Sequence, residues 1–184
     1  LSALRSYRNI PIVKILAGIR RCGKSTILDM LKNDLLSSGI NKEQIIDRRY
    51  TSLSLDEGMD ARSMYDDIKS IMTTDDMYYL LLDEVQEIPG WEKAVNSLYE
   101  DCKVDIYVTG SNSKLMSGEI STYLTGRYVL IPVYPLSFEE YLEFKNADHV
   151  EAKRLLPEYI RFGGFPIVAR GDYDERSAYQ IVEG

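Results

Sequence analysis

Short runs of consecutive apolar residues alternate along the chain with longer stretches in which apolar residues recur every three or four positions. A continuous apolar run of four to eight residues is typical of a strand covered on both faces, whereas the wider spacing is typical of a helix with one buried face. The runs predict strands over residues 13–17, 48–53, 77–85, 104–108 and 128–133. Strands that alternate with helices predict a mostly parallel sheet of about five strands between two layers of helices, a three-layer α/β sandwich.

Helices are predicted in the first, second and third gaps between these strands and again after the last strand. The apolar positions that mark the first three are Ile27, Leu31 and Leu35; Met64, Ile68 and Ile71; and Trp91, Ala94, Val95 and Leu98. Asp60 is placed to cap one helix, Gly39 to end another, and Ser137 with Glu140 to form a reciprocal capping box. A last helical piece over residues 152–162 precedes the sequence "GGFP".

A phosphate-binding loop lies between the first predicted strand and the first helix. The run "LAGIRRCGKS" matches G-x-x-x-x-G-K-[ST] from Gly18 to Ser25 in the strand-to-helix context that this motif requires. Glycines allow the backbone to wrap closely around phosphates, and the amides of the loop and helix N-terminus point at the anion. We expect Lys24 to reach the β- and γ-phosphates, Ser25 to bind Mg²⁺, and Thr26 to approach the α-phosphate.

The nucleotide contact is therefore assigned to one continuous segment. Its residues are Gly18, Ile19, Arg20, Arg21, Cys22, Gly23, Lys24, Ser25 and Thr26. Arg20 and Arg21 have no defined role in the motif, and simple exposure to solvent is the alternative for both. Cys22 lies near a lysine and a helix N-terminus, which lower a thiol pKa, but a small residue that fills the loop is the favoured interpretation.

Two adjacent carboxylates follow the most apolar strand, in "LLLDEV". Asp83 is placed to serve the Mg²⁺ site, as in the Walker B element, and Glu84 to orient and polarise the attacking water. The phosphate loop alone does not distinguish hydrolysis from phosphoryl transfer or storage, so Glu84 is the residue that favours hydrolysis. A solvated charge at the end of a strand is the alternative for Glu84.

Three further candidate residues lie next to later strands. Ser111 and Asn112 follow the strand over residues 104–108, which we expect between the first and third strands, where they could sense the γ-phosphate. Polar residues of a turn or helix cap are the alternative for this pair. Arg127, in "LTGRYVL", is a candidate for stabilising developing charge, in its own chain or from a neighbouring subunit, and a surface ion pair is the alternative.

Composition limits the classes of function. With 22 Lys and Arg against 29 Asp and Glu, the net charge of -7 predicts no general attraction to nucleic acid. The low number of cysteines, two, favours a reducing cytoplasm. The sequence contains no apolar run of about 18 residues, the length that a membrane-spanning helix needs. His149 is the single histidine, which excludes a histidine-based metal site.

With these motifs the chain resembles the AAA-like domain of a family of predicted bacterial and archaeal ATPases. The segments that carry the resemblance are "AGIRRCGKS", "LLLDEVQEIPGWEKAVNSL", "VTGSNSKLMS", "LTGRYVLIPVYPLSFEEY" and "GGFP". Cys22 departs from the family, in which a Val or Thr-like residue is more usual. The resemblance implies a P-loop domain of the additional-strand class, with a strand inserted between the two that carry the Walker motifs, and ATP with Mg²⁺ as its ligands.

The resemblance also implies a longer protein. We expect an ATPase core over residues 1–150 and, over residues 151–184, the start of a helical or winged-helix region that continues beyond the chain into a domain of unknown function. Contact with nucleic acid or a protein partner is expected through that region, and self-association is possible. The favoured function is Mg²⁺-dependent ATP hydrolysis, and a slow nucleotide-dependent switch is the alternative. A small-molecule kinase is disfavoured because no arginine-rich lid follows the sheet.

Overall fold

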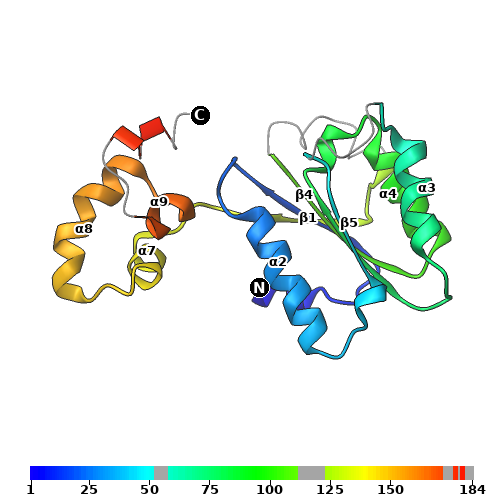
Figure 1. Ribbon diagram of the computed structural model, residues 1–184, viewed down its shortest axis with the longest axis horizontal. Coiled ribbons are helices and arrows are strands. Elements are labelled where there is room, and N and C mark those ends of the chain that lie inside the picture. Colours follow the sequence, from blue (N-terminus) through cyan, green and yellow to red (C-terminus); the bar gives the residue numbers. More distant parts are fainter. Residues whose placement is uncertain (52–57, 112–122, 172–175, 178, 181–184) are drawn as a thin grey trace. The chain divides into compact units, whose positions relative to one another are not determined.

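The structure is a computed structural model that describes residues 1–51, 58–111, 123–171, 176–177 and 179–180 (Figure 1). The chain divides into two compact units. The sheet unit comprises Leu1–Gly18 and Lys24–Pro132, and the helical unit comprises Ile19–Gly23 and Val133–Gly184. The domain boundary at residue 150 expected from the sequence remains a prediction.

A parallel sheet forms the centre of the sheet unit. Its strands in the described residues are β1 (Val13–Gly18), β2 (Ile45–Arg49), β3 (Tyr78–Asp83), β4 (Val104–Ser111) and β5 (Tyr128–Pro132). Their order is β2-β3-β4-β1-β5, and every neighbouring pair is parallel. Strand β4 therefore lies between β1 and β3, which confirms the additional-strand arrangement predicted for this sheet.

Four of the predicted strands agree with the structure to within a few residues, and one was predicted too far toward the C-terminus. Strand β2 begins at Ile45 and ends at Arg49, whereas the prediction began at Arg48 and ran to residue 53. Ile45 and Ile46 are the buried residues of this strand. Two apolar residues followed by Asp47 give too short a run to define a strand, which is why the pattern misplaced it.

Helices cover both faces of the sheet. Helix α2 (Lys24–Ser37) lies on one face, and α3 (Ala61–Ile71) and α4 (Trp91–Asp101) lie on the other (Figure 1). The predicted helix ends are confirmed: Asp60 accepts a hydrogen bond from the Ser63 amide at 2.9 Å, and Gly39 follows α2 with a φ of 86°. Glycine is favoured at a position with left-handed backbone after a helix, because glycine has no Cβ atom.

The core of the sheet unit lies between β3, β4 and the α3–α4 layer. Leu80 and Leu82 of β3 are fully buried, as are Val95 and Leu98 of α4. Burial of a side chain of this size contributes about 1.5–3 kcal/mol relative to its exposed state. The apolar run of β3, which does not alternate with polar residues, predicted a strand covered on both faces. This prediction is confirmed, because each residue of β3 is buried.

The helical unit contains α7 (Phe138–Phe144), α8 (His149–Phe162) and α9 (Pro166–Arg170). The capping box of Ser137 and Glu140 is present at the start of α7. Tyr159 donates its hydroxyl hydrogen to the Leu136 carbonyl at 2.9 Å, and the Leu136 amide donates to the Gly164 carbonyl at 2.7 Å. A Cβ on Gly164 would lie 1.8 Å from the Leu136 oxygen, so this close approach explains a glycine in "GGFP".

Shorter helical pieces also lie in the sheet unit. They are α1 (Ser2–Ser6), η1 (Lys42–Gln44) and η2 (Val85–Glu87). The sequence pattern missed all three, because a helix of one turn offers too few positions to show a period.

Candidate functional site

The candidate site lies at the carboxyl edge of the sheet, where β1, β3 and β4 end. In the strand register Gly18 pairs with Ser111, and Arg49 pairs with Asp83. The topology therefore brings the end of the phosphate-loop strand beside the end of β4, and β4 beside the end of β3. The crevice outside the carboxyl ends of parallel strands is where open α/β sheets bind ligands.

The phosphate loop leaves β1 at Gly18 and enters α2 at Lys24. Arg21 and Gly23 have positive φ angles of 65° and 98°. A residue with a side chain would be strained at the φ of Gly23, which explains why the second glycine of the motif is needed there. Helix α2 is 14 residues long, so its N-terminal amides and dipole favour an anion at the end of the loop.

Within the loop, Ile19, Arg20 and Arg21 are exposed, whereas Cys22 is buried. The burial agrees with the interpretation of Cys22 as a residue that fills space rather than a reactive thiol. Thr26 is exposed in the first turn of α2.

Lys24 is the buried cation of the site. Its side chain is almost enclosed, with 4% of the residue exposed. The Nζ atom donates a hydrogen bond to the Gly18 carbonyl at 3.1 Å and lies 3.8 Å from Oε1 of Glu84. The lysine amine therefore bridges the two ends of the phosphate loop and faces a carboxylate at the end of β3.

Asp83 and Glu84 differ in their surroundings although they are adjacent in sequence. Asp83 is buried at the end of β3, and its Oδ1 atom accepts a hydrogen bond from the Thr109 hydroxyl at 2.5 Å. Glu84 is half-buried and has a left-handed backbone with a φ of 55°, which turns the chain from β3 into η2. Its Oε2 atom accepts a hydrogen bond from the Gln86 side chain. The two carboxylates are therefore held by different partners.

The donor chemistry fits Mg²⁺ bound together with a nucleotide. The oxygens of Ser25 and Asp83 are hard donors of the kind Mg²⁺ takes, one or two from protein and the rest from phosphates and water. Among the residues that the structure describes, no group of three or more His, Cys, Asp or Glu side chains could hold a metal ion.

Of the two γ-phosphate candidates on β4, Ser111 ends the strand beside Gly18. Asn112 lies outside the described residues. The structure does not bring Arg127 to this edge. Arg127 precedes β5, its carbonyl accepts a hydrogen bond from the Val13 amide at 2.7 Å, and it therefore lies beside the start of β1.

The surroundings of Arg127 agree with a surface ion pair. Its guanidinium donates hydrogen bonds to Asn96 at 2.8 Å and to Glu100, both on α4. A strand of six residues rises about 3.3 Å per residue, so roughly 16 Å or more separates this position from Gly18 at the other end of β1. Arg127 cannot span that distance to a phosphate bound at its own loop.

Sequence reasoning missed two residues at the carboxyl edge. Thr109 is fully buried on β4 and accepts a hydrogen bond from the Glu84 amide at 3.0 Å, besides its bond to Asp83. Arg49 ends β2 beside Asp83, and its guanidinium hydrogen bond to Asp29 raises the pKa of Arg49 above its ordinary value. Thr109 had a signal in "VTGSNS", where it is a polar residue inside an apolar strand.

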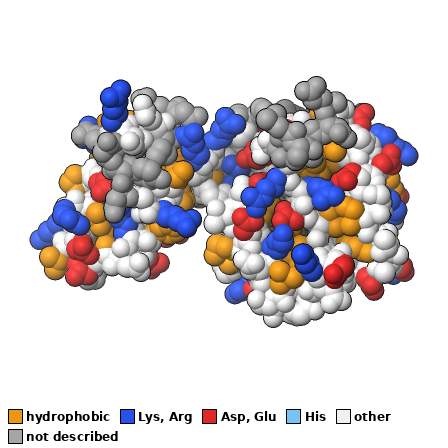
Figure 2. Space-filling model, in the orientation of Figure 1, with side chains coloured by type: hydrophobic (Ala, Val, Ile, Leu, Met, Phe, Trp, Pro, Cys, Tyr) orange, Lys and Arg blue, Asp and Glu red, His pale blue; other side chains and the backbone are white. Residues whose placement is uncertain are grey.

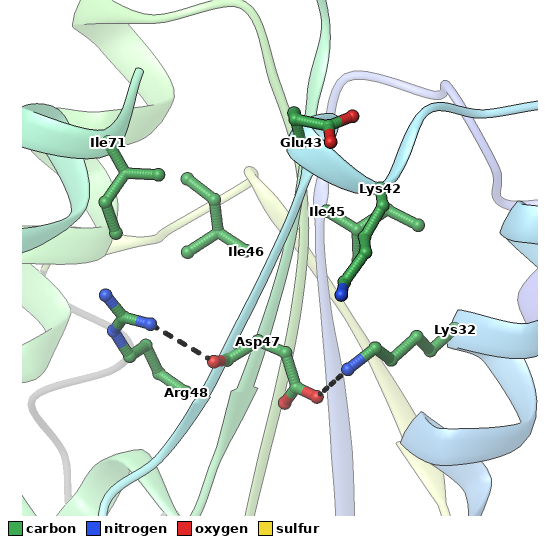
Figure 3. A pocket seen from close by; sticks show the side chains of 8 residues that line it. All are labelled: Lys32, Lys42, Glu43, Ile45, Ile46, Asp47, Arg48 and Ile71. Carbon is green, nitrogen blue, oxygen red and sulfur yellow. Dashed lines mark hydrogen bonds and ion pairs between the residues drawn. The ribbon is translucent and has the colours of Figure 1, made fainter. Parts of the chain in front are cut away.

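A hollow of about 380 Å³ lies elsewhere, along β2 (Figure 3). Three of its charged side chains take part in ion pairs: Lys32 pairs with Asp47 at 2.7 Å, and Arg48 pairs with Asp67 at 2.8 Å. On the face of the molecule in Figure 2, basic and acidic side chains are intermixed rather than separated by sign. The carboxyl edge of the sheet is the better candidate site, because Lys24, Asp83 and Glu84 lie there beside the phosphate loop.

Comparison with known proteins agrees with this geometry. A family model described as an AAA domain matches residues 11–142. The chain belongs to the AAA domain family. Domains of this family have the P-loop nucleotide-binding fold, and the sheet order of the structure is that of the family. The resemblance stated from the sequence is confirmed.

Two similar proteins are both described as uncharacterized. One, from Haemophilus influenzae, is 38% identical over 175 residues, which cover 94% of this chain and 44% of that protein. The other, from Methanocaldococcus jannaschii, is 32% identical over 180 residues, which cover 93% of this chain and 39% of that protein. The chain therefore spans less than half the length of these curated relatives. No helix among the described residues has the length and apolar character needed to cross a membrane.

Proposed function

We propose that the chain is the motor core of a Mg²⁺-dependent ATPase. The observation that carries the proposal is the pairing of Lys24 with Glu84: a buried lysine of the phosphate loop lies 3.8 Å from the carboxylate that follows the Walker B aspartate. A lysine and a carboxylate that converge at the phosphate loop can supply the cation for the γ-phosphate and the acceptor for the proton of water. ATP rather than GTP rests on the family resemblance.

The proposed reaction assigns one task to each residue. The amides of residues 18–25 and the Lys24 amine bind the β- and γ-phosphates, and Ser25 with Asp83 holds the cation. Bound Mg²⁺ would neutralise charge on the phosphates. Glu84 orients water and takes its proton as the water oxygen bonds to the γ-phosphorus. The bond to the bridging oxygen then breaks, which gives ADP and phosphate.

A slow nucleotide-dependent switch is the second candidate, and the state of Glu84 favours it. Its carboxylate is engaged by the Gln86 amide and faces Lys24, so it must leave these contacts before it can hold water. Phosphates that bind Lys24 would compete for the amine and release one of the contacts. A protein in which the contact with Gln86 persists would bind ATP and turn over slowly.

The experiment compares ATP binding and phosphate release by the full-length protein and two variants. Lys24→Ala is expected to lose ATP binding. Glu84→Gln keeps the size and the bond geometry, so we expect it to bind ATP normally and to release phosphate about 10²–10⁴-fold more slowly, the usual contribution of a general base. Tight binding without release by the wild type would leave the switch and exclude the ATPase. Equal rates for wild type and Glu84→Gln would exclude Glu84 as the base.

We further propose that the hydrolysis is coupled to a part of the protein outside this chain. The relatives are more than twice as long as the segment they share with it, which leaves room for such a part. Nucleic acid or a protein is the partner class implied by the family resemblance. Stimulation of phosphate release by DNA, RNA or a copurifying protein, measured with the full-length protein, would distinguish them.

The proposed role of Arg127 in charge stabilisation depends on self-association of the protein. Because this arginine is remote from its own phosphate loop, a role in charge stabilisation requires a neighbouring subunit. Sedimentation with and without ATP, together with mixing of Arg127→Ala and Lys24→Ala subunits, tests that role: restored phosphate release in the mixture would support it.

A further inference from the structure

Thr109 connects the Asp83 carboxylate with the Glu84 backbone amide through one buried hydroxyl. Leu82 of β3 is paired in register with Val108 of β4, so Asp83 and Thr109 are the next neighbours along the two strands. The Thr109 side chain is fully buried, and its oxygen lies 2.5 Å from Oδ1 of Asp83 and 3.0 Å from the Glu84 amide nitrogen. One side chain therefore contacts both residues assigned to the proposed chemistry.

The direction of the two hydrogen bonds follows from the donors available. A backbone N–H can only donate, so the Thr109 oxygen accepts from Glu84. The single hydroxyl hydrogen is then left for the Asp83 carboxylate. This bond fixes the orientation of the Asp83 side chain, while the Tyr50 amide fixes its backbone by donating to the Asp83 carbonyl at 3.0 Å.

The bond to Glu84 acts on its backbone. Glu84 has a φ of 55°, a conformation that residues with a Cβ rarely adopt. Left-handed residues other than glycine persist only where their surroundings hold them. The Thr109 bond holds the Glu84 amide at the point where the ladder of β3 ends, and the turn there directs the Glu84 carboxylate toward Lys24.

We infer that Thr109 is a positioning residue that sets the orientation of Asp83 and of Glu84 relative to each other. The inference rests on the proposed function, because it concerns the carboxylates that would hold the cation and the water. Thr109 itself is buried behind them and acts through both. Polar groups that hold the ligands of a metal site alter metal affinity or activity by about 10–100-fold when they are removed.

The test compares Thr109→Val with Thr109→Ser. Valine keeps the branched shape and strand preference but lacks the hydroxyl, and serine keeps the hydroxyl. For Thr109→Val we expect kcat to fall about 10–100-fold with KM for ATP unchanged, and the Mg²⁺ concentration that half-saturates binding of a non-hydrolysable ATP analogue to rise by a similar factor. Thr109→Ser is expected to behave like the wild type in both measurements.

A readout independent of turnover is hydrogen exchange at the Glu84 amide. We expect faster exchange in Thr109→Val than in wild type or Thr109→Ser, because the amide loses its acceptor. If the wild type releases no phosphate, the proposed function fails, while the exchange and the Mg²⁺ titration still test the positioning role. Should Thr109→Val fail to fold, as judged by Trp91 fluorescence, the smaller Thr109→Ala variant replaces it.

Two results would overturn the inference. One is a valine variant with the kcat, Mg²⁺ requirement and Glu84 exchange of the wild type. The other is a serine variant as impaired as the valine variant, since the hydroxyl would then not be the cause.

Discussion

A buried ion pair at the amino edge of the sheet offers a sharp test of the packing. Lys14 of β1 is fully buried, and Asp105 of β4 is 2% exposed. The Lys14 amine donates to Asp105 and to the Ile10 carbonyl at 2.7 Å. The other Asp105 oxygen accepts from the Asn9 amide at 2.8 Å and from the Tyr107 hydroxyl at 2.9 Å. Asp105 is therefore an acceptor for three donors, those of Lys14, Asn9 and Tyr107.

Asp105→Asn keeps the shape of the side chain and removes its charge. An asparagine presents one oxygen and one amino group, so the amino group must face either the Lys14 amine or the other two donors. Removal of one partner from a buried ion pair costs about 3–5 kcal/mol because the remaining charge is uncompensated. We expect a loss of that size in the free energy of unfolding, measured in urea by the fluorescence of Trp91, the single tryptophan and a buried residue of the same unit.

The control is Tyr107→Phe, which removes one donor and leaves both charges in place. A hydrogen bond to a charged group contributes about 1.5–3 kcal/mol, so this variant is expected to lose less than Asp105→Asn. A double variant with Lys14→Met and Asp105→Asn is expected to be less destabilised than the sum of the two single variants, by about 1–3 kcal/mol.

The pH dependence gives a second measurement on the same variant. Burial lowers the pKa of Lys14, and the contact with Asp105 opposes that shift. Without the carboxylate the pKa in the folded state falls further below its unfolded value. In the window between these two values the unfolded chain binds more protons, so stability rises with pH. The deficit of Asp105→Asn should therefore shrink on going from neutral pH toward pH 10.5, the ordinary lysine value.

Two results would refute this reasoning. One is a loss below about 1 kcal/mol, which is the range of exposed ion pairs. The other is a deficit that is independent of pH up to the lysine range. Either would mean that the Lys14 amine is solvated, contrary to its burial in the structure.

Three further predictions concern other parts of the molecule. Gly164→Ala is expected to disrupt the helical unit, because the new Cβ would lie 1.8 Å from the Leu136 carbonyl oxygen. Faster proteolysis within residues 133–171 measures this disruption, whereas unfolding of the sheet unit, followed by Trp91 fluorescence, is expected to be unchanged. Asp60→Ala is expected to lower the melting temperature at neutral pH, and by less as the pH falls below 3.8, the ordinary aspartate value, because the Ser63 amide contact lowers the pKa of Asp60. Asp60→Asn, which keeps the cap, is the control. Arg127→Ala is expected to change stability by less than about 1 kcal/mol and to leave ATP affinity at its own loop unchanged; a tenfold loss of affinity by titration calorimetry would contradict its placement.

Much of the fold followed from local pattern. The buried runs at β1, β3 and β4 and the caps at Asp60 and Ser137 each depend on residues within one element, so the sequence reveals them directly. The phosphate loop has the same property, since its glycines and lysine are consecutive along one turn of chain.

The parts that sequence did not reveal depend on pairing between elements. The polar residue Lys14 interrupts an apolar strand, and only the neighbouring β4 shows that Asp105 compensates its charge. Thr109 contacts Asp83 across two strands that are distant in sequence. Such partners become visible only when strand order and register are known.

The placement of Arg127 shows how strand direction divides polar residues between the two edges of this sheet. Gly18, Asp83 and Ser111 lie at the ends of their strands, so parallel pairing gathers them at the carboxyl edge. Arg127 precedes β5, which places it at the amino edge together with the start of β1. The order of an arginine and its strand in the sequence therefore decides which edge the arginine occupies. By that rule Arg49, which ends β2 beside Asp83, lies at the carboxyl edge, where its guanidinium pairs with Asp29 of α2.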